Sequence, residues 1–144
     1  MITWLVIANS SKAFVYDITQ KEAPGTKKPH YHSVIELSHS ASRLKTSDLV
    51  SDGHGEPAPH SDAHENEFQN FAREIAHYLE SERSKNSYKQ LVLCAGPHFH
   101  GLLNQTLSKQ TALMIKKHIE KDYIPLHTKE LSEVIESICH EMCN

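Results

Sequence analysis

The chain changes its hydrophobic period near Asp62, and this change constrains the fold more than any other feature of the sequence. Before it, residues 2–8 (ITWLVIA) and 12–18 (KAFVYDI) are short β-prone runs, separated by residues 9–11 (NSS), a suitable hairpin connection. Residues 33–38 (SVIELS) have the composition of a third, shorter strand. The N-terminal part therefore predicts an antiparallel meander of three strands.

Beyond Asp62 the apolar residues recur with the period of an α-helix, which predicts an amphipathic helix over residues 63–82. Asp62 followed by Glu65 fits a capping box, so we expect Asp62 to cap this helix. The apolar face consists of Phe68, Phe71, Ala72, Ile75, Ala76 and Leu79.

The second half of the chain alternates between strand and helix signals. Residues 90–95 (QLVLCA) form a continuous apolar run, typical of a strand that is covered on both faces. Gly96-Pro97 ends this run, and helical spacing then resumes as far as Leu107. Residues 111–120 fit a helix or a strand, and part of them is interpreted as a strand because a parallel neighbour would complete the sheet. A last helix is expected to begin near Thr128.

The element order predicts a single α/β domain spanning residues 1–144. We expect a mixed five-stranded sheet with an antiparallel meander followed by two parallel strands, and helices on both faces. This order is the one expected of a ribonuclease H-like domain.

Composition narrows the function classes. The net charge of -3 gives no electrostatic reason to expect strong binding to nucleic acid or to an anionic membrane. No apolar run approaches the roughly 20 residues needed to cross a bilayer, and the N-terminal run lacks the basic segment of a signal peptide. Three cysteines without zinc-finger spacing suit a reducing compartment, so we expect a cytoplasmic protein.

Several segments occur in an order that resembles a known bacterial family, the "protein required for attachment to host cells". They are TWLVIANSSKAFVYD, SDLVSDGHGE, ENEFQNFAREIAHYL, LVLCAGP and KDYIPLHTKELSEVI. The resemblance spans nearly the whole chain, and its most specific parts are SDLVSD-G-G before the long helix and KDYIPLHTKEL near the end.

The resemblance further implies a distant relation to the middle domain of eukaryotic and archaeal peptide-chain release factors, where a Gly-Gly-Gln loop precedes the long helix. The corresponding residues 51–56 read SDGHGE, which lacks Gly-Gly-Gln. Peptidyl-tRNA hydrolysis is therefore not implied for this chain.

Residues 47–68 (SDLVSDGHGEPAPHSDAHENEF) carry the strongest candidate site, and three interpretations remain open. The segment is a polar connection whose carboxylates cap the helix, a binding loop that feeds a helix N-terminus, or a metal site built from histidines. His98 and His100 join the candidates because they follow residues 90–95, and ligands often bind beyond the carboxyl ends of parallel strands. The candidate binding residues are Asp52, Gly53, His54, Gly55, His60, His64, His98 and His100.

Catalytic signatures are weak in this sequence. The first strand ends in Asn9-Ser10 and no carboxylate closes residues 90–95, which argues against the acidic cluster of a ribonuclease H-like nuclease. Cys94 lies within an apolar run and is interpreted as a core residue. We therefore expect no catalytic residues, no resident metal and no cofactor.

The sequence favours a non-catalytic interaction protein of the host-attachment family with a macromolecular partner. One alternative is a translation-linked factor that binds tRNA or the ribosome. Another is a metal-dependent hydrolase that uses the clustered histidines.

Overall fold

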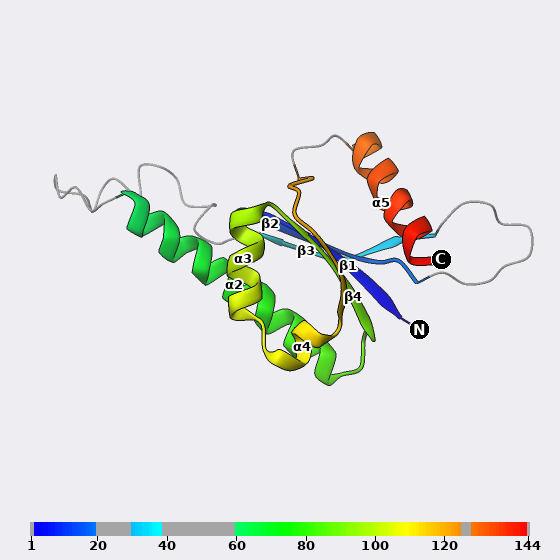
Figure 1. The fold of residues 1–144 in the computed structure, drawn as a ribbon, viewed down its shortest axis with the longest axis horizontal. Coiled ribbons are helices and arrows are strands. Elements are labelled where there is room, and N and C mark those ends of the chain that lie inside the picture. The colour runs from blue at the N-terminus through cyan, green and yellow to red at the C-terminus, as the bar shows by residue number, and fades with distance from the viewer. Residues whose placement is uncertain (1, 20–29, 39–59, 125–127, 144) are drawn as a thin grey trace, which may run out of the picture.

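The computed structural model describes residues 2–19, 30–38, 60–124 and 128–143 (Figure 1). The elements in chain order are β1 (Thr3–Ala8), β2 (Lys12–Asp17), β3 (His32–Ser38), α2 (His60–Ser84), β4 (Gln90–Ala95), α3 (Pro97–Thr106), α4 (Lys109–Leu113), β5 (Ile115–Ile119) and α5 (Thr128–Cys143).

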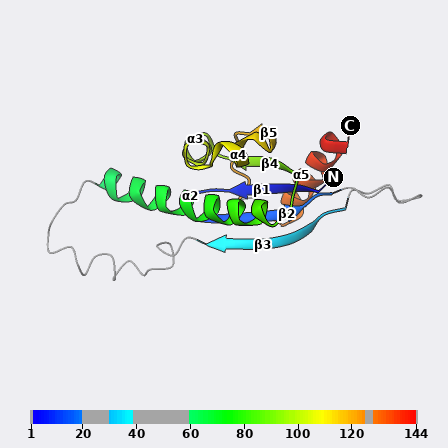
Figure 2. The ribbon, with the colours of Figure 1, turned by 90° about the horizontal axis from the view of Figure 1, so that it is seen from below.

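The strands form one five-stranded sheet in the order β3-β2-β1-β4-β5 (Figure 2). β1 pairs antiparallel with β2, placing Trp4 opposite Asp17, and parallel with β4, placing Thr3 opposite Gln90. β2 pairs antiparallel with β3, and β4 pairs parallel with β5. The predicted mixed sheet is confirmed, and β1 lies at its centre.

The β1–β2 connection is held by the side chain of Asn9. Its Oδ1 accepts hydrogen bonds from the backbone N–H groups of Ser11 and Lys12, at 2.8 and 2.9 Å. The backbone N–H of Asn9 donates to the carbonyl of Lys12 at 2.8 Å. An asparagine at this position stabilises the turn because its amide oxygen replaces a missing backbone acceptor.

Helix α2 begins at His60, two residues before Asp62. The prediction that Asp62 is the helix cap is therefore wrong. Asp62 is the third residue of the helix. The expected span of 63–82 is otherwise confirmed and extended at both ends.

The end of α2 is a Schellman motif centred on Asn86. Asn86 has a φ of 60°, in the left-handed region that asparagine tolerates better than most residues. The N–H of Ser87 donates to the carbonyl of Glu82, and the N–H of Asn86 to that of Arg83, both at 3.0 Å. This turn redirects the chain from α2 into β4.

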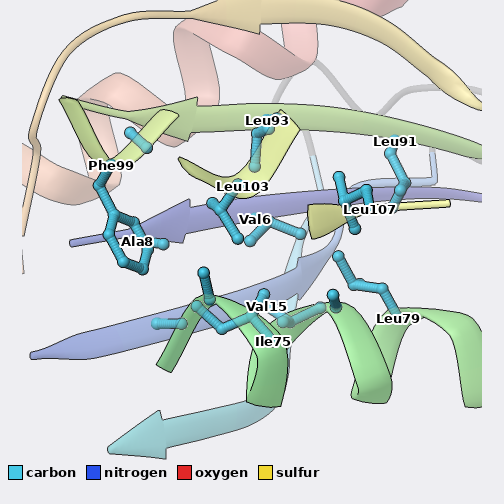
Figure 3. Packing of buried hydrophobic residues seen from close by; sticks show 14 of the residues in the cluster. Val6, Ala8, Val15, Ile75, Leu79, Leu91, Leu93, Phe99, Leu103 and Leu107 are labelled. Carbon is cyan, nitrogen blue, oxygen red and sulfur yellow. The ribbon is translucent and has the colours of Figure 1, made fainter. Parts of the chain in front are cut away.

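The core consists of two layers, one on each face of the sheet. On one face, alternate residues of β1, β2 and β4 pack against α2 and α3, as Figure 3 shows for Val6, Val15 and Leu93 with Ile75 and Leu103. On the other face α5 covers the sheet. This second layer includes Leu5, Ile7, Val92, Cys94, Leu131, Ile135, Ile138 and Cys139.

The ambiguous segment 111–120 divides into the end of α4 and strand β5. The hydroxyl of Ser108 caps α4 by accepting the N–H of Thr111 at 3.2 Å. The prediction that part of this segment is a strand parallel to its neighbour is confirmed. Across the described ranges, every helix is too short or too polar to cross a lipid bilayer.

Candidate binding site at the carboxyl ends of the parallel strands

The parallel pairing of β1, β4 and β5 brings their carboxyl ends to the same edge of the sheet, where ligands of α/β proteins usually bind. A hollow of about 230 Å³ lies at this edge. It is lined by Asn9, Ser10, Phe68, Gly96, Pro97, His98, Phe99 and Asp122. These residues come from the ends of β1 and β4, from α2, from the first turn of α3, and from the segment after β5.

Helix α3 begins at this hollow without a side-chain cap. Gly96 is the N-cap residue and makes no side-chain hydrogen bond, Pro97 follows it, and the first turn contains no acidic residue. The N–H of His100 starts the helical hydrogen bonds by donating to the carbonyl of Gly96 at 2.8 Å. The positive end of the α3 dipole is therefore directed to this edge.

The walls of the hollow are largely aromatic and aliphatic, and its rim is polar. Phe68 and His98 meet edge to face, with ring centroids 6.2 Å apart. On the rim, the carboxylate of Asp122 accepts the N–H of Ile124 at 3.0 Å. A Cβ atom on Gly96 would lie 3.6 Å from the Cβ of Asp122, so a larger residue at position 96 would narrow the mouth of the hollow.

The two histidines predicted after β4 have different environments. His98 is exposed and lines the hollow, whereas His100 is buried. Two residues correspond to about 200° of rotation around an α-helix, so the two side chains cannot point the same way. The ring of His100 instead contacts Asn104 of its own helix and His118 of β5.

The other candidate residues are not brought into this site by the described structure. Asp52, Gly53, His54 and Gly55 lie outside the described residues. The backbones of His60 and His64 lie in the first two turns of α2, while their side chains are outside the description. Their role as a binding loop stays a prediction.

A metal centre has no support from the described residues. Within them, histidine, cysteine and carboxylate side chains do not gather in any group of three or more that would hold an ion. The interpretation of Cys94 as a core residue is confirmed, since its side chain is buried beneath α5. Burial raises the pKa of the Cys94 thiol to about 12, which leaves little thiolate for nucleophilic attack.

Sequence reasoning missed Asn9, Ser10, Phe68 and Asp122 as members of this site. A usable signal was present for three of them. Asn9 and Ser10 follow β1, and Asp122 follows β5, so the rule that selected His98 after β4 would have selected them as well. Phe68 had been assigned to the apolar face of α2, and it packs at the end of that face where the hollow opens.

Comparison with known proteins agrees with the resemblance described above. Residues 4–135 match the model of a family described as "Protein required for attachment to host cells". No curated protein matches the chain.

Proposed function

Because the chain belongs to the family of proteins required for attachment to host cells, we propose that it acts by binding a partner without catalysing a reaction, and that the hollow at the carboxyl ends of β1 and β4 receives one group of that partner. The observation that carries this proposal is the size of the hollow. Its volume of about 230 Å³ is below the range of about 300–1,000 Å³ typical of pockets that enclose a whole small molecule. A hollow of this size suits a single anchoring side chain.

The lining of the hollow supports an apolar anchor. Phe68, Pro97 and Phe99 provide apolar wall surface, and buried aromatic or aliphatic anchors contribute most of the affinity in many protein interfaces. The uncapped start of α3 favours a carbonyl or carboxylate oxygen beside that anchor. The preferred partner is therefore a protein segment with an apolar side chain next to an oxygen acceptor.

Two polar side chains at the hollow already hold the local backbone, which favours a binding function over a catalytic one. The Asn9 amide oxygen is used twice in the β1–β2 turn, and the Asp122 carboxylate holds the backbone of Ile124. Cys94, which lies near this edge, is fully buried. These groups stabilise local backbone structure, which leaves Ser10 and His98 as the polar side chains best suited to contact a partner.

The proposal is tested by cross-linking and then by affinity measurement. A photoreactive residue placed at position 98 should cross-link one partner that the same residue at position 77, an exposed site on α2, does not. His98→Trp, which fills the hollow, should then weaken binding of that purified partner by tenfold or more. His77→Trp should leave the affinity unchanged. Equal affinity of the two variants would refute the assignment of the hollow.

The translation-linked function remains a second proposal, motivated by the resemblance to release-factor middle domains. Lys116, Lys117 and Lys121 along β5 and just after it favour contact with a phosphate backbone. Lys117, however, pairs with Glu141 of α5, and Glu120 and Asp122 interrupt the basic run. Co-sedimentation with ribosomes that falls steeply with salt would support this function.

The metal-dependent hydrolase is a third proposal and rests on the histidines of the sequence alone. Its test is the metal content of protein purified without a histidine tag. One equivalent of zinc that is lost in a His60→Ala, His64→Ala double variant would support it. Absence of bound metal after zinc incubation would dismiss it.

A further inference from the structure

Two imidazole rings meet between α3 and the edge strand β5. Nε2 of His100 lies 2.9 Å from Nδ1 of His118, and the ring centroids are 4.9 Å apart. The side chain of His100 is only 5% exposed, whereas His118 lies on the surface. The contact therefore joins a buried ring on a helix to an accessible ring on the outermost strand.

The hydrogen bond between the two rings requires that at least one of them be neutral, because a doubly protonated pair has no acceptor. Asn104 Nδ2 lies 3.0 Å from Nδ1 of His100 and donates to it, so the hydrogen of His100 is on Nε2 and is donated to His118. Both nitrogens of His100 are then occupied. If the Asn104 amide is rotated by 180°, both hydrogen bonds reverse their direction, and His118 donates to His100. The other nitrogen of His118, which is accessible, can then bind one proton. A second proton removes the acceptor between the rings and places two positive charges side by side.

We propose that His100 and His118 form a pH-sensitive latch, which holds β5 against α3 while the rings are neutral and opens when both are protonated. Among the described residues, the carboxylate of Glu120 also acts on His100, and its Oε1 lies 3.9 Å from Nδ1 of His100. The Glu120 carboxylate is exposed and well hydrated, so it compensates little of the charge on the buried ring.

The shift in pKa agrees with this arrangement. Burial, together with the neighbouring His118, lowers the pKa of His100, and Glu120 opposes the shift. The unfolded chain, with histidines near their usual pKa of about 6.5, then takes up more protons than the folded chain. Stability contributed by the latch is complete above this pKa and is lost as the pH falls below it.

The latch lies beside the proposed binding hollow. His98, two residues before His100, lines the hollow on α3, and Asp122, two residues after Glu120, lines it on the segment after β5. Opening the latch would separate these two walls. This consequence rests on the proposed function, whereas the latch itself is tested without any partner.

The first measurement compares urea unfolding of the unsubstituted protein and of His100→Gln between pH 8 and pH 5. Glutamine keeps a hydrogen-bonding group at this position but does not titrate. Below pH 6.5, the unfolding equilibrium constant of the unsubstituted protein should rise, relative to the variant, by up to about tenfold per pH unit. His77→Gln, which removes an exposed histidine of α2, should follow the unsubstituted protein.

The second measurement is nitrogen NMR of the imidazoles in the unsubstituted protein, which needs no variant to fold. We expect His100 to bind its proton only below the ordinary histidine pKa of about 6.5, and its coupling to His118 to disappear when the second proton binds. Full protonation of both rings at pH 6 without loss of stability would overturn the proposal. So would uptake of one zinc ion per chain that requires both histidines, because the pair would then be a metal site.

Discussion

Ser108, the residue that caps α4, donates its hydroxyl hydrogen to the carboxylate of Glu80 near the end of α2. The hydroxyl of Thr111 donates to the same carboxylate oxygen, and Arg83 pairs with the other oxygen at 3.0 Å. Glu80 therefore joins two helices that lie on the same face of the sheet. Three hydrogen-bond donors stabilise the negative charge of Glu80, whose side chain is partly exposed.

Replacing Glu80 with Gln should lower the free energy of unfolding by about 1–3 kcal/mol at pH 7, because the charge-assisted hydrogen bonds become weaker neutral ones. Urea denaturation measures this difference. Glu74→Gln removes an exposed carboxylate from the same helix and serves as the control. Equal stability of the two variants would mean that the carboxylate of Glu80 is replaceable by solvent.

The Glu80 contribution should depend on pH in a definite direction. Hydrogen bonds from Ser108 and Thr111 lower the pKa of Glu80 from 4.5 to about 2. When the pKa of a carboxyl group is lower in the folded state than in the unfolded state, the ionised group stabilises the fold at any pH above its unfolded-state pKa. This stability is lost as the pH falls toward the folded-state pKa. The stability difference between the unsubstituted protein and Glu80→Gln should therefore shrink between pH 4.5 and pH 2. A difference that stays constant in acid would contradict the assignment.

Asn86 should tolerate Gly but not Ala. The residue has a φ of 60°, which costs a residue with a Cβ atom roughly 1–2 kcal/mol unless it is asparagine or aspartate. Asn86→Ala should lower the melting temperature, while Asn86→Gly should match or exceed the unsubstituted protein. Calorimetry of both variants gives the comparison, and a stable Ala variant would mean that the turn has rearranged.

Phe71 occupies the centre of the layer between α2 and the sheet, and it is fully buried. Truncation of Phe71 to Ala should destabilise the fold by about 3–5 kcal/mol through lost apolar burial and a new cavity. Asn70→Ala, at the exposed neighbouring position, should change the free energy of unfolding by no more than about 0.5 kcal/mol. Chemical denaturation of the two variants separates the loss of packing from the change in helix propensity that Ala brings.

Cys94 and Cys139 should resist thiol reagents as long as the protein is folded. Both side chains are buried in the same core layer, between the sheet and α5, and burial raises the pKa of Cys94 to about 12. In a Cys143→Ser variant, labelling at pH 8 should be on the order of a thousandfold slower than in urea. Rapid labelling of the folded variant would reveal local opening of α5.

The strands and their pairing were predictable because local and global signals agree in them. The alternating and continuous apolar runs set which residues face each layer, and the short β1–β2 turn at Asn9 left an antiparallel pair as the simplest arrangement. The start of α2 was not predictable to the residue. Ser61 and Asp62 both have the composition of a cap, but α2 begins before either of them, at His60, because a local capping signal does not fix the first residue of a helix.

The site was predictable only in part, since its membership depends on which strand ends become neighbours. His98 was found because it follows β4, whereas Ser10 and Asp122, which follow the neighbouring parallel strands β1 and β5, were missed because the same rule was not applied to those strands. The separation of His98 from His100 follows from helix rotation, which requires the helix boundary to be known first. The partner of His100, His118, lies on a strand that the sequence left ambiguous.

The central position of β1 has a consequence for how the chain folds during synthesis. β1 is synthesised well before its parallel partner β4, in which Gln90 pairs with Thr3. In the interval, the β1–β2 hairpin exposes an unpaired edge and two apolar faces. Long-range pairing of this kind slows folding, because the loop must close before the contact forms. The interval in which β1 and β2 have been made but β4 has not is therefore the stage at which this protein is most exposed to aggregation and most dependent on chaperones.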